Sequence, residues 1–201
     1  METFKKVMSW VLPVVIGLLI ALGIRTYIVQ PVRVDGPSML PNLQNNERVL
    51  TWKQAKIHRG SVVVFNANGV DPQVSEKTYY VKRVIAVPGD TVEAKNGKLY
   101  VNGKLVNQKY ISAYQRKQGT GTWTLKSISV DNSWLKNSGA TKVTAGHYFV
   151  LGDHRSVSND SRYYGFVPKK KILGVVQVGF WSTNSTKKNN VNNQWKHYFA
   201  N

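Results

Sequence analysis

The chain has 201 residues, 42% of them hydrophobic, which is enough for one domain with a core plus an anchor, or for two small domains. It has no cysteine, which excludes a disulfide framework, a thiolate zinc site and a cysteine nucleophile. Lys and Arg outnumber Asp and Glu by 28 to 10, and the formal net charge of +18 favours polyanionic neighbours. No zinc-finger spacing, basic heptad helix or ribonucleoprotein motif accompanies this charge. We therefore expect contact with anionic membrane lipids and not with nucleic acid.

An uncharged apolar run covers residues 7–24, preceded by two lysines and followed by Arg25. A membrane-spanning helix needs about 17–25 such residues. A cleavable signal peptide is the alternative, because residues 21–23 resemble a small-residue cleavage site. The run is long for the apolar core of a signal peptide, so we favour an uncleaved anchor over residues 1–29. Basic residues flank it on both sides and do not set its orientation.

A serine lies between two prolines just after this anchor. Pro37 and Pro41 fix their own backbone φ angles and bias the residues before them away from helix. Gly36 can adopt backbone angles that are closed to other residues. This pattern predicts a rigid, non-helical presentation of Ser38. The alternative is a proline-rich linker between an anchor and a domain.

The rest of the chain reads as a mainly β domain over residues 30–181. Apolar, β-branched runs predict strands at residues 47–52, 61–65, 78–87, 146–151 and 172–181. Two Asn-Gly pairs predict a tight β-meander over residues 91–107, within a small β insert at about 91–145 whose second part, 108–145, is partly irregular. Residues 182–201 are mostly Asn, Lys, Ser and Thr, and predict a mobile polar tail.

A serine hydroxyl needs a neighbouring base before it can act as a nucleophile. His154 follows Asp153, and a Ser-His-Asp arrangement stays open because triads are assembled in space. Lysine is the other candidate, since burial can lower its pKa from about 10.4 by several units. Lys82 lies inside the apolar strand 78–87 and is best placed for this. The alternative is an edge strand from which Lys82 points to solvent.

Three blocks, in this order after an N-terminal anchor, resemble the type I signal peptidases, a membrane-bound Ser–Lys family. They are residues 36–43, 80–90 and 152–162, and residues 59–65 fit a weaker fourth block. The short insert and Gly36 resemble the Gram-positive type. The resemblance implies antiparallel sheets of the signal-peptidase type and a serine endopeptidase that removes signal peptides from exported preproteins. It also implies cleavage after small residues, no cofactor and no metal.

The resemblance further implies a location and a mechanism. The protein would cross the cell membrane once, with its N-terminus cytoplasmic and its catalytic domain extracytoplasmic. Ser38 would be the nucleophile and Lys82 the general base, with Ser158 orienting the lysine amine. The N–H of Ser38 would hold the oxyanion. Some members have a serine hydroxyl as second donor where Gly36 stands, so a backbone or water donor must serve there.

Asp160 and Arg162 would form a supporting ion pair with Arg83 nearby. Two positions depart from the family's usual pattern: Asn42 stands where threonine is usual, and His154 stands where asparagine is usual. Both residues can still form hydrogen bonds, so we expect the chemistry to survive and His154 to be structural.

Cleavage after small residues implies two shallow apolar pockets. Their candidate walls lie next to the motifs and are Val32, Val34, Met39, Leu43 and Val81. The substrate would add as a β-strand near residues 32–36 and 79–82. The alternative for these apolar residues is an ordinary core.

Two other functions fit parts of the sequence. A membrane-anchored binding protein could use the charge of +18 on cell-wall or lipid anions. A self-cleaving repressor-type Ser–Lys protein would need a DNA-binding module, and residues 1–30 form an apolar segment instead. The complete set of motif residues favours the signal peptidase.

Overall fold

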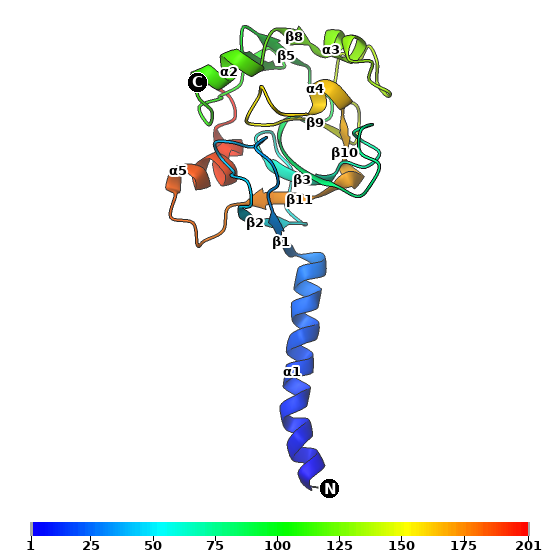
Figure 1. Cartoon of the computed structure of the whole chain (residues 1–201), viewed down its shortest axis with the longest axis vertical. Coiled ribbons are helices and arrows are strands. Elements are labelled where there is room, and N and C mark those ends of the chain that lie inside the picture. The colour runs from blue at the N-terminus through cyan, green and yellow to red at the C-terminus, as the bar shows by residue number, and fades with distance from the viewer. Residues whose placement is uncertain (1, 201) are drawn as a thin grey trace.

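The computed structural model describes residues 2–200, with side chains from residue 6 onward. Helix α1 (Glu2–Tyr27) projects from one end of a β domain (Figure 1). Its 26 residues span about 39 Å, more than the roughly 30 Å of a bilayer's hydrocarbon core. Within the described residues, the segment Lys6–Tyr27 is the one helix long and apolar enough to cross a membrane. The chain is thus mainly β with one N-terminal apolar helix, as expected.

The domain caps the end of this helix. Lys53 Nζ donates to the carbonyls of Arg25 (3.2 Å) and Thr26 (2.7 Å), and Gln54 Nε2 donates to that of Tyr27 (3.2 Å). The last carbonyls of a helix have no partner within it, and a cation there is favoured by the helix dipole. Helix α1 is therefore joined to the domain by more than its peptide connection.

A seven-stranded antiparallel sheet forms the main layer of the domain. Its order is β1-β2-β11-β3-β4-β9-β10. The strands are β1 (Val29–Arg33), β2 (Arg48–Trp52), β3 (Val62–Asn66), β4 (Tyr79–Ala86), β9 (His147–Leu151), β10 (Val167–Pro168) and β11 (Ile172–Gln177). Alternate residues of β3 enter different cores: Val62 and Val64 join one cluster, Val63 and Phe65 another. Both faces of this central strand are buried, which explains its unbroken apolar sequence.

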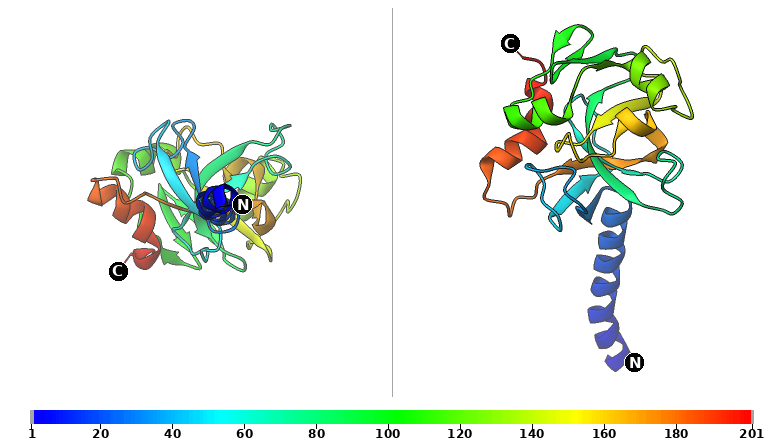
Figure 2. Two further views of the ribbon diagram at one scale, coloured as in Figure 1. Left: turned by 90° about the horizontal axis from the view of Figure 1, so that it is seen from below. Right: turned by 45° about the horizontal axis from the view of Figure 1, so that its top comes forward.

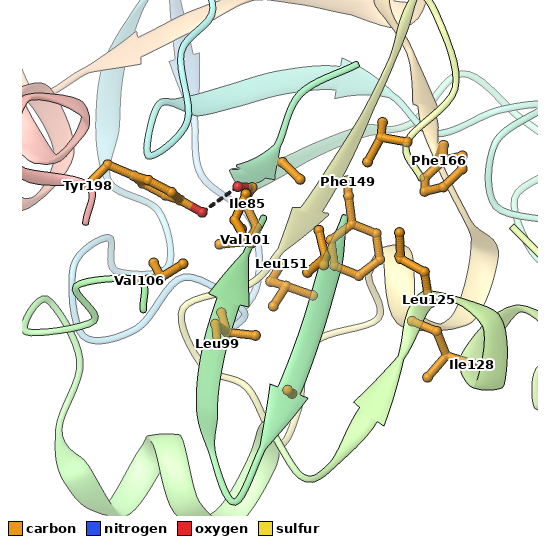
Figure 3. Packing of buried hydrophobic residues seen from close by; sticks show 14 of the residues in the cluster. Ile85, Leu99, Val101, Val106, Leu125, Ile128, Phe149, Leu151, Phe166 and Tyr198 are labelled. Atoms are coloured by element: carbon orange, nitrogen blue, oxygen red, sulfur yellow. Dashed lines mark hydrogen bonds between the residues drawn. The ribbon is translucent and has the colours of Figure 1, made fainter. Parts of the chain in front are cut away.

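A second, four-stranded sheet has the order β7-β6-β5-β8. Its strands are β5 (Val92–Lys95), β6 (Lys98–Val101), β7 (Lys104–Leu105) and β8 (Trp123–Thr124). Asn96 and Gly97 have φ angles of 50° and 79°, which suit the two-residue hairpin between β5 and β6. Figure 3 shows the core between the sheets, where residues of β4, β9 and β6 pack with Leu125 and Tyr198.

The segment 108–145 differs from the expected irregular β structure. Apart from the short strand β8, it contains helices α2 (Ala113–Gly119) and α3 (Leu125–Asp131). Each begins with a capping box, Ser112 with Gln115 and Thr124 with Ser127, which satisfies free N–H groups of the first turn. Helix α4 (Ser161–Tyr164) and the 3₁₀ helix η1 (Lys169–Lys171) lie between β9 and β11.

The prediction of a mobile tail is wrong, because residues 182–200 are folded against the domain. They form α5 (Ser185–Lys188), the π-helix η2 (Asn189–Asn193) and the 3₁₀ helix η3 (Gln194–His197), which lie to one side of α1 when the molecule is seen from below (Figure 2). Val191 and Tyr198 are buried, and Phe199 forms a β-bridge with Val106. The Tyr198 hydroxyl donates to the carbonyl of Ile85 (Figure 3). A few well-placed apolar side chains are enough to hold this polar segment.

Candidate active site

Ser38 lies in the loop between β1 and β2, which is fixed from two directions. Its carbonyl accepts a hydrogen bond from the N–H of His154 (3.0 Å), while Val34 forms backbone hydrogen bonds with Asn46 and Glu47. Gly36 has a φ of 80°, a conformation that favours glycine. The Ser38 side chain is only half-buried. The loop thus presents a held but accessible hydroxyl.

Lys82 lies on β4, and its Nζ is 2.7 Å from Ser38 Oγ. The side chain is buried, with 4% of the residue exposed. Its Nζ also lies 5.4 Å from the centre of the Tyr80 ring, two residues earlier on the same face of the strand. The structure therefore brings a buried amine to a serine 44 residues away in the chain.

Burial is the main influence on the Lys82 amine, and it lowers the pKa of Lys82 from 10.5 to about 8. Asp160 acts against this shift, Arg162 adds to it, and Asp153 and Asp71 oppose it. With a pKa of about 8, roughly one Lys82 in ten is neutral at pH 7, against roughly one in 3,000 for an ordinary lysine. A neutral amine can accept the proton of the Ser38 hydroxyl.

Two buried ion pairs lie beside this dyad. Asp160 pairs with Arg162 through two contacts, of 2.8 and 2.9 Å, and also accepts the N–H of Gly152 (3.0 Å). Arg83 does not join this pair. It forms its own bidentate pair with Asp153 (2.8 and 2.7 Å), with both side chains fully buried. Sequence reasoning considered Asp153 only as a partner for His154.

Ser158 does not make the expected hydrogen bond to Lys82. Its hydroxyl is buried and has no hydrogen-bond partner among the described residues. It packs against Gly152, where an added Cβ would overlap Ser158 Oγ and lie 2.6 Å from the Ser38 carbonyl oxygen. Gly152 therefore lets Ser158 and the Ser38 backbone approach each other closely, but the hydroxyl does not orient the amine in this structure.

The oxyanion donors can be compared directly. The N–H of Ser38 donates to no group of the described residues, so it is free to bind a developing oxyanion. The N–H of Gly36 donates to the side-chain oxygen of Asn45 (3.0 Å), so it is occupied and does not fill the place expected for it.

His154 is not connected to the serine through its ring. Its backbone N–H holds the Ser38 carbonyl, while its buried Nδ1 has no hydrogen-bond partner among the described residues. Asp153, the carboxylate a triad would need, is bound by Arg83 and by Asn42 Nδ2 (2.8 Å). The arrangement favours a structural role for His154.

The candidate pocket residues gather in one place, but mostly as core. Val34, Met39, Leu43 and Val81 belong to one buried cluster that Val32 borders, and of these only Val32 is half-buried. Two strand edges are open nearby. Among the residues that the structure describes, β1 pairs only with β2, and the part of β4 over residues 79–82 pairs only with β3. A cavity of about 820 Å³ lies elsewhere, bordered by residues 69–72 and 135–137, and neither Ser38 nor Lys82 lines it.

The C-terminal segment supplies contacts that sequence reasoning missed. Asn190 accepts a hydrogen bond from Arg83 at its carbonyl (2.9 Å) and donates from its amide to Asn42 Oδ1 (2.9 Å). The Asn42 amide donates in turn to Asp153 and to the carbonyl of Tyr110. Nothing in the local sequence pattern marks Asn190 for this role.

Comparisons with known proteins show which proteins this chain is similar to. The family model described as "Signal peptidase, peptidase S26" matches residues 7–181. Signal peptidase IB of Staphylococcus aureus is 36% identical over 189 residues, and signal peptidase I S of Bacillus subtilis is 38% identical over 191 residues; each match covers 92% of this chain and 95% of the relative. A crystal structure of a signal peptidase I from Enterococcus faecalis covers 60% of this chain and 97% of its own, with 31% identity and a TM-score of 0.49.

Proposed function

Because the chain belongs to the signal peptidase family, peptidase S26, we propose that it is a membrane-bound serine endopeptidase that removes signal peptides from exported preproteins. Ser38 is the nucleophile and Lys82 the general base. The observation that carries this proposal is the 2.7 Å contact between Lys82 Nζ and Ser38 Oγ, made by an amine that burial holds at a pKa of about 8.

The geometry supports a two-stage reaction. Neutral Lys82 accepts the hydroxyl proton while Ser38 Oγ bonds to the scissile carbonyl carbon, and the N–H of Ser38 stabilises the oxyanion. The Lys82 ammonium then gives its proton to the leaving amine, which leaves an acyl-enzyme. Lys82 next takes a proton from water, whose oxygen bonds to the ester carbonyl carbon. The bond between that carbon and Ser38 Oγ then breaks, and the Lys82 ammonium returns the proton to Ser38 Oγ.

The substrate lies as an added strand between the open edges of β1 and of residues 79–82. Val32 is the one half-buried member of the apolar set next to these edges, so it is the first candidate for a pocket wall that accepts small side chains. The buried members of the set pack behind Val32 and fix the shape of this pocket wall; they are Val34, Met39, Leu43 and Val81.

Helix α1 crosses the membrane and places the catalytic domain on the extracytoplasmic side. Only ten residues separate the end of α1 at Tyr27 from Ser38, and Lys53 and Gln54 hold the helix end against the domain. Such a connection keeps the dyad close to the bilayer, where the end of a signal peptide emerges. The basic surface of the protein suits anionic lipids at this position.

The test is cleavage of a preprotein by the full-length chain in detergent or lipid vesicles. Ser38→Ala and Lys82→Ala should each remove activity almost completely, while circular dichroism shows that both variants fold. Near-normal cleavage by Lys82→Ala would disprove the dyad. Cleavage that persists in Ser38→Ala but disappears in His154→Ala would favour a histidine mechanism instead.

A further inference from the structure

Asp71 is a buried carboxylate in the loop between β3 and β4, outside every motif of the sequence. Only 2% of the residue is exposed. Its Oδ2 accepts hydrogen bonds from the Tyr80 hydroxyl (3.0 Å) and from Asn159 Nδ2 (2.6 Å), and its Oδ1 accepts the N–H of Gln73 (3.0 Å). Within the part of the chain that the structure describes, Asp71 forms no ion pair. A buried carboxylate without a cationic partner is costly, so it needs an explanation.

Two of its three partners lie beside the dyad. The Tyr80 ring stands 5.4 Å from Lys82 Nζ, and Asn159 directly follows Ser158, which packs against Gly152. Asp71 thus joins the strand that carries the base to the turn that lies behind the nucleophile. Burial, and after it the hydrogen bond to Asp71, raises the pKa of Tyr80 to about 12, so its hydroxyl remains a donor throughout the working pH range.

The charges around Lys82 differ in how far they are neutralised. Asp160 is paired with Arg162, and Asp153 is paired with Arg83. Asp71 is the third carboxylate that acts on Lys82, with the smallest effect of the three, and its own contacts are neutral donors. Its negative charge is therefore the least offset of the three.

We propose that Asp71 is a positioning residue for the Ser38–Lys82 dyad: it fixes Tyr80 against the Lys82 amine and Asn159 beside Ser158. This inference rests on the proposed function, since it assigns a role to Asp71 in the same reaction. The loop between β3 and β4, which contains no motif, would then position Lys82 through Asp71 and Tyr80.

Three variants separate the parts of this role. Asp71→Asn keeps a hydrogen-bond acceptor of nearly the same shape but removes the charge. Tyr80→Phe keeps the ring beside Lys82 but removes the hydroxyl that Asp71 holds. Asp131→Asn, which removes an exposed carboxylate from α3, is the matched control.

The first measurement is the pH profile of kcat/KM for preprotein cleavage by the full-length protein in detergent. The second is the titration of Lys82 itself, followed by nitrogen-15 NMR in lysine-labelled protein. Loss of the Asp71 charge, which raises the pKa of Lys82, should move the acidic limb and the Lys82 titration to lower pH. Tyr80→Phe should lower kcat several-fold and leave the acidic limb in place.

A purely structural role predicts the opposite shift, because a loosened site admits water and returns the lysine pKa toward 10.5. An upward shift in Asp71→Asn, or a profile and titration equal to those of wild type and Asp131→Asn, would overturn the proposal. If Asp71→Asn does not fold, a wild-type kcat in Tyr80→Phe overturns it. The Lys82 titration can be measured without any cleavage. If the wild-type protein cleaves no preprotein, the proposed function is wrong, but the titration still tests whether Asp71 acts on Lys82.

Discussion

Two regions of very different sequence meet in one buried hydrogen-bond network. The loop at residues 36–43 carries a motif and two prolines, and it presents Ser38. The C-terminal segment 182–200 carries no motif, yet Asn190 contacts both Asn42 in that loop and Arg83 beside Lys82. The residues proposed to perform the chemistry thus lie in a recognisable pattern, whereas those that hold them in place through single amide groups do not.

The two regions also differ in what their burial costs. The motif side contains a buried ammonium and two buried ion pairs, all of which need partners to offset desolvation. The C-terminal side contributes neutral amides and the apolar side chains of Val191 and Tyr198. Removing single groups on each side should therefore give effects of different size and different pH dependence.

The largest effect is expected from Arg83→Met. This change leaves the fully buried Asp153 carboxylate without its cation, and breaking a buried pair in this way costs about 3–5 kcal/mol. We expect the free energy of unfolding, measured by denaturant titration of the full chain in detergent, to fall by that amount. The double variant Arg83→Met/Asp153→Leu should recover much of the loss. A single variant as stable as wild type would show that the pair does not hold the site.

The second prediction concerns Lys82→Met, which should raise the free energy of unfolding at pH 7 instead of lowering it. The pKa of Lys82 is lower in the folded protein than in the unfolded chain, so between pH 8 and 10.5 the unfolded chain binds more protons and stability rises with pH. Below pH 8 the buried ammonium costs the folded state about 3 kcal/mol. Lys82→Met should therefore be more stable than wild type at pH 7, while it cleaves nothing.

The difference in unfolding free energy between Lys82→Met and wild type should shrink as pH rises from 8 and vanish near 10.5. Groups distant from Lys82 contribute equally to the stability of both proteins, so their effects cancel in this difference. A gap that stays constant from pH 6 to 10.5 would mean that Lys82 is not held in a desolvated place. No such pH dependence is expected for changes in the C-terminal segment.

Local patterns predicted much of the fold. The apolar runs at 61–65 and 146–151 became β3 and β9, and Asn96-Gly97 became a hairpin turn, because strand period and turn chemistry act over a few residues. Helices α2 and α3 were missed because each has seven residues, too few for an amphipathic repeat. Their capping boxes, such as Ser112 with Gln115, were the available signal.

Less of the candidate site could be predicted from local patterns. The strand pattern alone favoured a solvent-facing Lys82 on an edge strand, and only the combination of motifs suggested that it lies beside Ser38. The pairing of Arg83 with Asp153 joins residues 70 apart, and the sequence neighbour of Asp153 suggested a histidine partner instead. Asp71 lies between the predicted strands 61–65 and 78–87, and no sequence signal marks it, since burial of a single carboxylate depends on packing that no local pattern encodes.

The smallest effect is expected on the C-terminal side, from Asn190→Ala. The carbonyl bond to Arg83 belongs to the backbone and survives, but Asn42 Oδ1 loses its donor. Leaving a buried acceptor unpaired costs about 1–3 kcal/mol. We expect a fall of that size in the free energy of unfolding and a several-fold fall in preprotein cleavage, because Asn42 lies four residues after Ser38. Asn189→Ala is the matched control, since Asn189 is exposed on the same helix. Equal stability and activity in the two variants would show that the segment only covers the site; loss in Asn190→Ala alone would make a motif-free segment part of the machinery that holds the nucleophile.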